Sequence, residues 1–355
     1  MSALANLDPA ALAKQFAEWG YKPSHAAWVL RAFYEGREIA PSQARGLPQG
    51  LVERMQKAFP GVASALAARQ VAADGTTKLL LRLADGRTVE SVLMPDFRAD
   101  RAAGCVSSQV GCAMGCDFCA TTKTGFERNL TAGEIIEQFL ALRREARAVG
   151  RKLQTVVFMG MGEPMLNLDS VLTAVRRIAD NQLGALGWRQ ITVSTVGIVP
   201  GIEALTATGL NVHLAVSLHA PDDATRARLL PMGRRFPIAE ILAAADEFQA
   251  RRGRPVTIQY CLLAGVNDSP EHARMLADLL ASRRMHINLL RYNPTGLSLR
   301  GVTYEPSSDQ VAEAFAAVLR ARKLVAHFRR SRGPDIDAAC GQLRERTSQK
   351  ESSAA

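Results

Sequence analysis

From about residue 98 onward, short apolar segments alternate with longer amphipathic segments. The apolar segments have the length of buried strands and lie at 155–160, 190–195, 211–217, 256–263, 286–292 and 323–328. The amphipathic segments have the length of helices and lie at 132–149, 167–181, 201–208, 237–252, 270–283 and 307–321. Such alternation is typical of parallel strands joined by crossover helices. With a first strand near Gly104–Gln109, it predicts an α/β fold, a partial (β/α)6 barrel.

The residues before this region follow other patterns. Short helices are expected at 8–20, 24–36 and 47–59, and two strands are expected within 66–95 around a turn at Asp85 and Gly86. The end of the chain is polar. We therefore predict four parts: a small N-terminal helical domain at 1–62, a β-hairpin linker at 63–97, the barrel core with a C-terminal segment at 98–343, and a disordered tail at 344–355.

The net charge of +10 comes mainly from arginine. Adjacent arginines recur at 143–144, 234–235, 251–252, 283–284 and 329–330. The guanidinium fork suits phosphate oxygens, so the charge favours a nucleic-acid partner. The alternative is an ordinary solvated surface rich in arginine.

No stretch of eighteen apolar residues is present, so the sequence predicts no membrane span. The first residues lack a basic segment followed by an apolar one, and they do not resemble a secretory signal. We therefore expect a cytoplasmic protein.

Three cysteines, Cys112, Cys116 and Cys119, form a C-x3-C-x2-C loop. Such clustering in a long chain without an export signal favours metal ligation over disulfides. Three thiolates can bind three irons of a cubane and leave the fourth iron open, whereas electron-transfer clusters usually have four cysteines. The alternative is a structural zinc site, but no histidine lies between residues 26 and 212 to complete it.

This loop, with Phe118 before its third cysteine, resembles that of the radical S-adenosylmethionine superfamily. The resemblance implies a [4Fe-4S] cluster whose open iron binds S-adenosylmethionine. The string GMGEP at 160–164 is similar to the glycine-rich segment of that superfamily, which contacts the methionine amino group. It implies that Gly162 and Glu163 bind the cofactor.

Further cofactor contacts are implied by short strings at the ends of expected strands. They are Ser194, Ser217, Leu218, His219 and Asn293. Ligands of parallel α/β folds bind at the carboxyl ends of the strands, which agrees with these positions.

The wider sequence resembles one subgroup, the RNA adenine methyltransferases that modify carbon 2 of adenosine in 23S rRNA and tRNA. The strings CVSSQVGC, GFERNLTAGEI, VSLHAPDDATR, GVNDS and DIDAACGQL carry this resemblance. A sister group methylates carbon 8 with shared motifs. The resemblance implies RNA as substrate, two molecules of S-adenosylmethionine per turnover, and an electron donor such as flavodoxin or ferredoxin.

The same resemblance implies roles for residues outside the cysteine loop. Cys340 matches the thiol that carries the methyl group, and Cys105 matches the thiol that resolves a protein–RNA crosslink by forming a disulfide. Glu90 matches a proton acceptor, although it lies two residues farther from Cys105 than in the family pattern. Cys261 matches no family role and is interpreted as a core residue.

Two segments depart from the family pattern: KPSHAAWVLRAFY near the N-terminus and RYNPTGLSLRGVTYEPS after residue 290. Three alternatives to carbon-2 methylation therefore stay open. They are carbon-8 methylation, a noncatalytic RNA-binding protein with a structural metal, and a radical enzyme acting on a small molecule.

Overall fold

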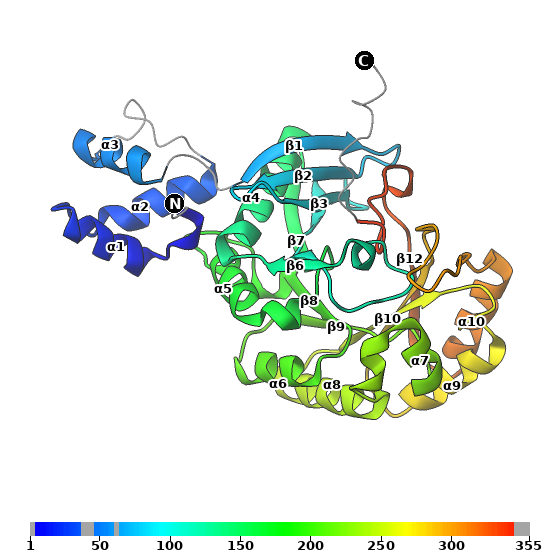
Figure 1. The fold of residues 1–355 in the computed structure, drawn as a ribbon. Helices are drawn as coiled ribbons and strands as arrows, with labels where there is room; N and C mark the ends of the chain where they lie inside the picture. Colours follow the sequence, from blue (N-terminus) through cyan, green and yellow to red (C-terminus); the bar gives the residue numbers. More distant parts are fainter. Residues whose placement is uncertain (1–3, 37–45, 60–63, 344–355) are drawn as a thin grey trace, which may run out of the picture.

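The computed structural model describes residues 4–36, 46–59 and 64–343. Near the N-terminus it has three helices, α1 (Pro9–Glu18), α2 (His25–Glu35) and α3 (Gln49–Ala58), as predicted. Asp8 caps α1 by accepting a hydrogen bond of 2.7 Å from the backbone N–H of Ala11. Figure 1 shows these helices gathered beside the main body. The predicted tail at 344–355 lies outside the described residues.

The main body is built on one ten-stranded sheet. Seven strands run parallel to one another: β4 (Arg101–Cys105), β7 (Lys152–Phe158), β8 (Ile191–Thr195), β9 (His213–Ser217), β10 (Thr257–Leu262), β11 (His286–Arg291) and β12 (Val325–Arg329). The crossover helices are α4 (Ala132–Ala148), α5 (Leu168–Ala179), α6 (Val199–Ala207), α7 (Asp223–Leu229), α8 (Ile238–Arg252), α9 (Pro270–Leu280) and α10 (Asp309–Ala321). The predicted partial (β/α)6 barrel is confirmed, with β12 after its sixth unit.

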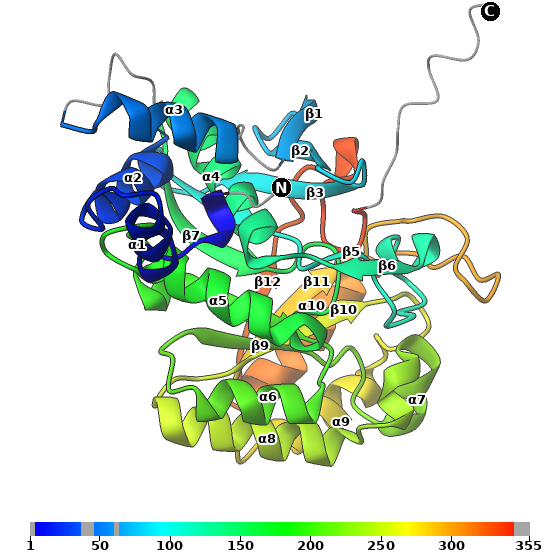
Figure 2. The ribbon, with the colours of Figure 1, turned by 60° about the vertical axis from the view of Figure 1, so that its left-hand side comes forward.

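The helices cover the outside of the curved sheet. Figure 2 shows α5, α6 and α8 along one side of the strands. Tyr260 on β10 and Phe315 on α10 are fully buried, and their ring centroids are 5.3 Å apart. The strands are almost continuously apolar because helices bury their outer face and loop residues cover much of the inner face.

The prediction of a two-stranded hairpin linker was incomplete. The structure has three antiparallel strands, β1 (Ser64–Val71), β2 (Thr77–Leu83) and β3 (Thr88–Pro95), and β3 pairs with β4. These strands therefore extend the barrel sheet. β1 lacks a sequence signal because almost all its side chains are exposed, which leaves no apolar alternation.

The first parallel strand begins and ends a few residues earlier than predicted, at Arg101–Cys105. Residues after it form a separate small hairpin of β5 (Gln109–Gly111) and β6 (Phe126–Asn129). The cysteine loop connects these two short strands, so both of its ends are fixed by backbone pairing.

Candidate functional site

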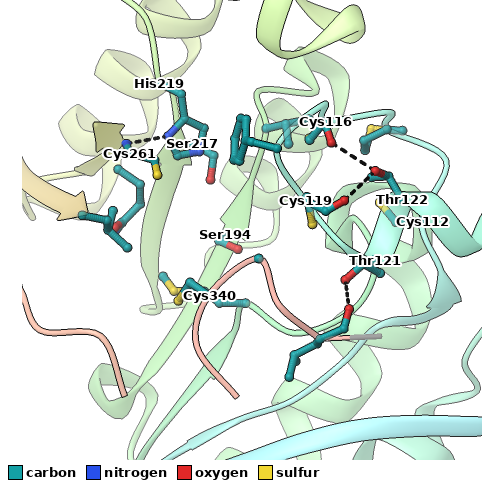
Figure 3. Close-up of a pocket in the computed structure, with 18 of the residues that line it drawn as sticks. Cys112, Cys116, Cys119, Thr121, Thr122, Ser194, Ser217, His219, Cys261 and Cys340 are labelled. Carbon is teal, nitrogen blue, oxygen red and sulfur yellow. Dashed lines mark hydrogen bonds between the residues drawn. The ribbon is translucent and has the colours of Figure 1, made fainter. Parts of the chain in front are cut away.

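A cavity at the carboxyl ends of the parallel strands brings most of the predicted site residues together (Figure 3). It holds about 1100 Å³ of empty space, its open mouth included. The predicted residues that line it are Cys112, Cys116, Cys119, Gly162, Glu163, Ser194, Ser217, His219, Asn293 and Cys340. Leu218 does not line it, because its side chain is fully buried.

The cysteine loop is held by hydrogen bonds along its own backbone. The Thr122 hydroxyl donates to the carbonyl oxygens of Cys116 and Cys119 at 3.0 and 2.9 Å. The loop starts after Gly111, whose φ is +72°. A Cβ atom there would lie 1.9 Å from the carbonyl oxygen of Gly125, so only glycine allows the two strands of this hairpin to approach so closely.

The thiols of this loop lie in a water-poor environment. Burial raises the pKa of Cys112 to about 12 and raises the pKa values of Cys116 and Cys119, and neighbouring thiolates raise that of Cys116 further. Backbone N–H groups of Met114 and Gly162 oppose this shift at Cys112 by bonding to its sulfur. Three such thiolates need a cationic centre to be stable together.

The arrangement of donors fits a cluster better than a single ion. Among the described residues, no three side chains of His, Cys, Asp or Glu converge closely enough to hold one metal ion. The three cysteine sulfurs nevertheless face one cavity from one loop. The structural zinc alternative therefore lacks a ligand set in the described chain, whereas corners of a larger iron–sulfur centre can be spaced this widely.

Glu163 is a buried carboxylate at the wall of the cavity. Its two oxygens accept hydrogen bonds from the backbone N–H groups of Met165 and Val196, at 3.0 and 2.8 Å. Burial nevertheless raises its pKa to about 7. The adjacent Gly162 has a φ of +96°, and a Cβ there would lie 2.5 Å from the side chain of Gln109. Glu163 is thus fixed in position to meet a cationic group in the cavity.

His219 is held as a neutral imidazole. Its Nδ1 accepts a hydrogen bond of 2.9 Å from the backbone N–H of Cys261, and burial lowers its pKa to about 3. Its φ of +58° turns the chain at the end of β9. Its ring contacts that of Phe118 edge to face at 5.1 Å between centroids, which links the end of β9 to the cysteine loop.

The interpretation of Cys261 as a core residue was incomplete. Its side chain is buried, but it also lines the cavity. Its place near the carboxyl end of an expected strand was the signal that could have indicated this. Arg329 on β12 lines the cavity too, and sequence reasoning had treated it only as part of a basic pair.

Cys340 and Cys105 line a second cavity, which adjoins the first. Cys340 lines both cavities and is exposed, whereas Cys105 lines only the second and is buried. Burial raises the pKa of Cys105 to about 12, and the negative charge of the Cys340 thiolate adds to the shift. Arg329, Arg330 and Arg332 line the same cavity, so it is basic.

The disulfide expected between Cys105 and Cys340 is not present. Both residues are free thiols, as are the other four cysteines, all of which are described. A bond that forms only when a crosslink is resolved would be absent from the resting chain, so the disulfide is not a structural element of the fold.

Glu90 lies beneath these cavities and lines neither of them. Its carboxylate is buried and 3.1 Å from the Lys78 Nζ. The Lys78 ammonium also donates to the backbone oxygen of Asp337, at 3.3 Å, in the segment that carries Cys340. The Ser107 hydroxyl donates to the carbonyl of Glu90 at 2.7 Å. Glu90 is therefore placed close to the Cys340 segment as one half of a buried ion pair.

The segment that carries Cys340 is attached to the cysteine loop. The Ala120 N–H donates to the Gly341 carbonyl at 2.7 Å. The Thr121 hydroxyl donates to the Leu343 carbonyl at 2.6 Å (Figure 3). The Asn293 amide donates to the Cys340 carbonyl at 3.4 Å.

In the described part of the chain, no helix combines the length and hydropathy needed to cross a membrane.

Known proteins resemble this chain along nearly its whole length. The family model for the radical SAM superfamily matches residues 106–280. A probable dual-specificity RNA methyltransferase, RlmN 1 of Opitutus terrae, is 74% identical over 341 residues, which is 96% of each chain. The probable dual-specificity RNA methyltransferase RlmN of Rhodopirellula baltica is 42% identical over 92% of this chain and 86% of its own.

A solved structure agrees in fold. A radical SAM methyltransferase from Sphaerobacter thermophilus superposes with a TM-score of 0.91 and is 41% identical, covering 97% of this chain and 99% of its own. The resemblance found in the cysteine loop and the flanking strings is thereby confirmed. The chain belongs to the RlmN family of dual-specificity RNA methyltransferases, within the radical SAM superfamily.

Proposed function

We propose that this chain methylates carbon 2 of adenosine in 23S rRNA and tRNA through a methylated Cys340. One observation carries the proposal: Cys340 lines both the cavity of the three clustered cysteines and the cavity of Cys105. A single thiol can thus face a radical source on one side and a resolving thiol on the other. A noncatalytic RNA-binding protein would have no use for this arrangement.

The residues present fit the cofactors of the superfamily. Cys112, Cys116 and Cys119 would hold a [4Fe-4S] cluster, and S-adenosylmethionine would contact Gly162, Glu163, Ser194, Ser217, His219 and Asn293. When bound, they supply a methyl group and a carbon radical able to take hydrogen from a methyl group. Such chemistry is needed because carbon 2 of adenine has no lone pair with which to attack a sulfonium.

The chain's own residues perform the remaining steps. The Cys340 sulfur would accept a methyl group from one S-adenosylmethionine, and this methyl group would then lose one hydrogen atom to the carbon radical that a second molecule supplies. The carbon then bonds to carbon 2 of the base and crosslinks it to Cys340, and the unpaired electron of this adduct would return to the cluster. Glu90, which is paired with Lys78 and lines neither cavity, would accept the proton of the adenine carbon only after the Cys340 segment next to it has moved. The Cys105 thiolate then bonds to the Cys340 sulfur, and the carbon–sulfur bond of the crosslink breaks with its electron pair left on the carbon. That carbon takes up a proton to become the methyl group, and the disulfide left on the protein must be reduced before the next turnover.

Several parts of this proposal concern partners. We propose that α1–α3, within an accessory domain at 1–62, contact the RNA, and that 63–97 link this domain to the core at 98–343. A flavodoxin or ferredoxin would supply electrons to the cluster. We expect the enzyme to act in the cytoplasm, together with these RNA substrates.

Nucleoside mass spectrometry tests the function directly. Digested 23S rRNA and tRNA from cells with the gene should contain 2-methyladenosine that cells lacking the gene do not make. Purified, reconstituted protein should form the same nucleoside on both unmodified RNAs. Exclusive formation of 8-methyladenosine would assign the chain to the sister activity. RNA left unmodified in both assays would contradict RNA methylation altogether.

The affinity for S-adenosylmethionine should fall as the pH drops below about 7. Burial holds the pKa of Glu163 at about 7, so below this pH the free carboxyl is protonated. An ammonium bound beside it favours the carboxylate, so binding must then release a proton and weakens by up to about tenfold per pH unit. His219, with a pKa of about 3, stays neutral throughout this range.

Equilibrium dialysis of the reconstituted protein between about pH 6 and 8 measures how the affinity for S-adenosylmethionine changes with pH. Glu163→Gln should bind S-adenosylmethionine roughly tenfold or more weakly at pH 8, because it loses a charge-assisted contact. The affinity of this variant should also no longer depend on pH in this range. A slope that persists in Glu163→Gln would assign the titration to another group.

A further inference from the structure

The side chain of Arg226, on α7, is the largest fully buried side chain in the described structure, with 1% of its surface exposed. One terminal nitrogen, Nη2, donates to the carbonyl oxygen of Val196. The other two, Nε and Nη1, have no hydrogen-bond partner among the described residues. A buried guanidinium with two unpaired nitrogens is costly unless something else in the site compensates it.

No carboxylate of the described chain is hydrogen-bonded to this guanidinium, because Nη2 donates to a carbonyl and the other two nitrogens have no partner. The charge of Asp223, one turn away, stabilises it without a direct bond. The Asp223 carboxylate instead accepts a hydrogen bond of 2.8 Å from the N–H of Ile238. The strongest stabilising influence on the charge of Arg226 is the thiolate of Cys116.

The position of Arg226 follows from the contact between α7 and the cysteine loop. At the end of α7, the Leu229 carbonyl accepts a hydrogen bond of 2.9 Å from the N–H of Asp117. Just beyond it, Pro231 lies 3.3 Å from the Cβ position of Gly115. These contacts flank Cys116 on both sides in the sequence. Arg226, one turn before Leu229, therefore lies behind the middle cysteine of the loop.

Arg226 is also connected, through Val196, to Glu163 at the wall of the first cavity. The Val196 carbonyl accepts from Arg226, while the Val196 N–H donates to the Glu163 carboxylate at 2.8 Å. One peptide segment thus lies between the buried cation and the buried anion of the site. Arg226 itself does not line the cavity, so its charge acts through the loop and not on the substrate.

We propose that Arg226 is a positioning residue for the iron–sulfur cluster, whose guanidinium neutralises charge behind Cys116 and stabilises the cluster after it gains an electron. Three thiolates on a [4Fe-4S] core of charge +2 give a net charge of −1, and one added electron makes it −2. A fixed cation next to this centre in a water-poor environment favours the reduced form, because net charge and hydrogen bonds to sulfur set cluster potentials. Nε and Nη1 have no partner among the described residues, and the negative charge of the Cys116 sulfur is the strongest that acts on this guanidinium.

The inference rests on the cluster and not on the RNA substrate or on the roles of Cys340, Cys105 and Glu90. Its test therefore needs no RNA. Arg226→Met removes the charge and keeps much of the volume, and Arg226→Lys keeps the charge. The matched control is Arg143→Met. Arg143 is half-buried, donates to the carbonyls of Gly184 and Tyr34, and also has its pKa lowered to about 10 by burial.

The proteins are reconstituted anaerobically, analysed for iron and sulfide, and titrated with a reductant while the reduced cluster is followed by electron paramagnetic resonance. In Arg226→Met the equilibrium constant for reduction should fall at least tenfold, a shift of about 59 mV for one electron. Arg226→Lys should retain most of the wild-type value, and Arg143→Met should equal it.

Two results would overturn the proposal. One is a fully loaded Arg226→Met protein with the wild-type potential. The other is an equal fall in the reduction potential, or in the iron content, of Arg226→Met and Arg226→Lys. Lost packing, and not lost charge, would then explain the effect. If Arg226→Met takes up no iron while Arg226→Lys does, the charge is needed even earlier, for assembly. Wild-type protein that binds no cluster would refute the cofactor assignment and this inference together.

Discussion

Cys340→Ala should lose methylation of RNA by roughly a thousandfold or more, because removing the residue that forms a covalent intermediate leaves no alternative route. The loss should come without loss of the cluster. Cys340 is exposed and outside the cysteine loop, so its replacement should change the free energy of unfolding by only about 0.5 kcal/mol. Methyl transfer to RNA from labelled S-adenosylmethionine measures the activity, and the visible absorbance and iron content report the cluster.

The matched variant is Cys261→Ala, which removes the other thiol that lines the cavity outside the cysteine loop. Peptide mass spectrometry should still find S-methylcysteine at position 340 in this variant and none in Cys340→Ala. Methylation that survives Cys340→Ala, or a methyl group found on Cys261, would show that the wrong thiol has been assigned.

Cys105→Ala should convert the enzyme into a form that stays covalently attached to its RNA. The mechanism needs a second thiol to break the bond between Cys340 and the base, and Cys105 is the other cysteine of the second cavity. Without it, the reaction should stop at the crosslink. A denaturing gel should show a stable protein–RNA species after one turnover, with little free methylated RNA.

The double variant Cys105→Ala with Cys340→Ala separates this crosslink from nonspecific radical damage, since it should form no adduct. The wild type should release its product and accumulate little crosslink. If Cys105→Ala releases methylated RNA at the wild-type rate, Cys105 has no part in resolution, and its shared cavity with Cys340 would be a feature of packing.

The sequence predicted the parts of the site that depend on short-range patterns. Buried parallel strands are continuous apolar segments, so their ends can be found from the sequence, and Ser194 and Ser217 do lie at or near the ends of β8 and β9. The three clustered cysteines lie within one loop. Their mutual proximity was therefore fixed by the chain itself.

Contacts between distant segments could not be predicted in the same way. The pairing of Lys78 with Glu90 depends on the register of β2 against β3, and the contact of Lys78 with Asp337 joins residues 259 positions apart. The sequence of α7 is short and charged, typical of a solvated turn, and nothing local indicates that Arg226 would be buried. Whether a charged side chain is buried depends on which distant segments of the chain pack against it.

The barrel is not closed, and this matters for a polymer substrate. The order of the main sheet runs from β1 to β12 without the two ends pairing in the described chain. The segment carrying Cys340 crosses toward the free end of the sheet, where Asp335 accepts a hydrogen bond of 3.0 Å from the Ala73 N–H. A nucleotide within a folded RNA cannot be threaded through a ring, so it has to enter and leave sideways. An open seam that has Cys340 along it, the thiol proposed to carry the methyl group, would allow one base to be inserted while the rest of the RNA stays outside.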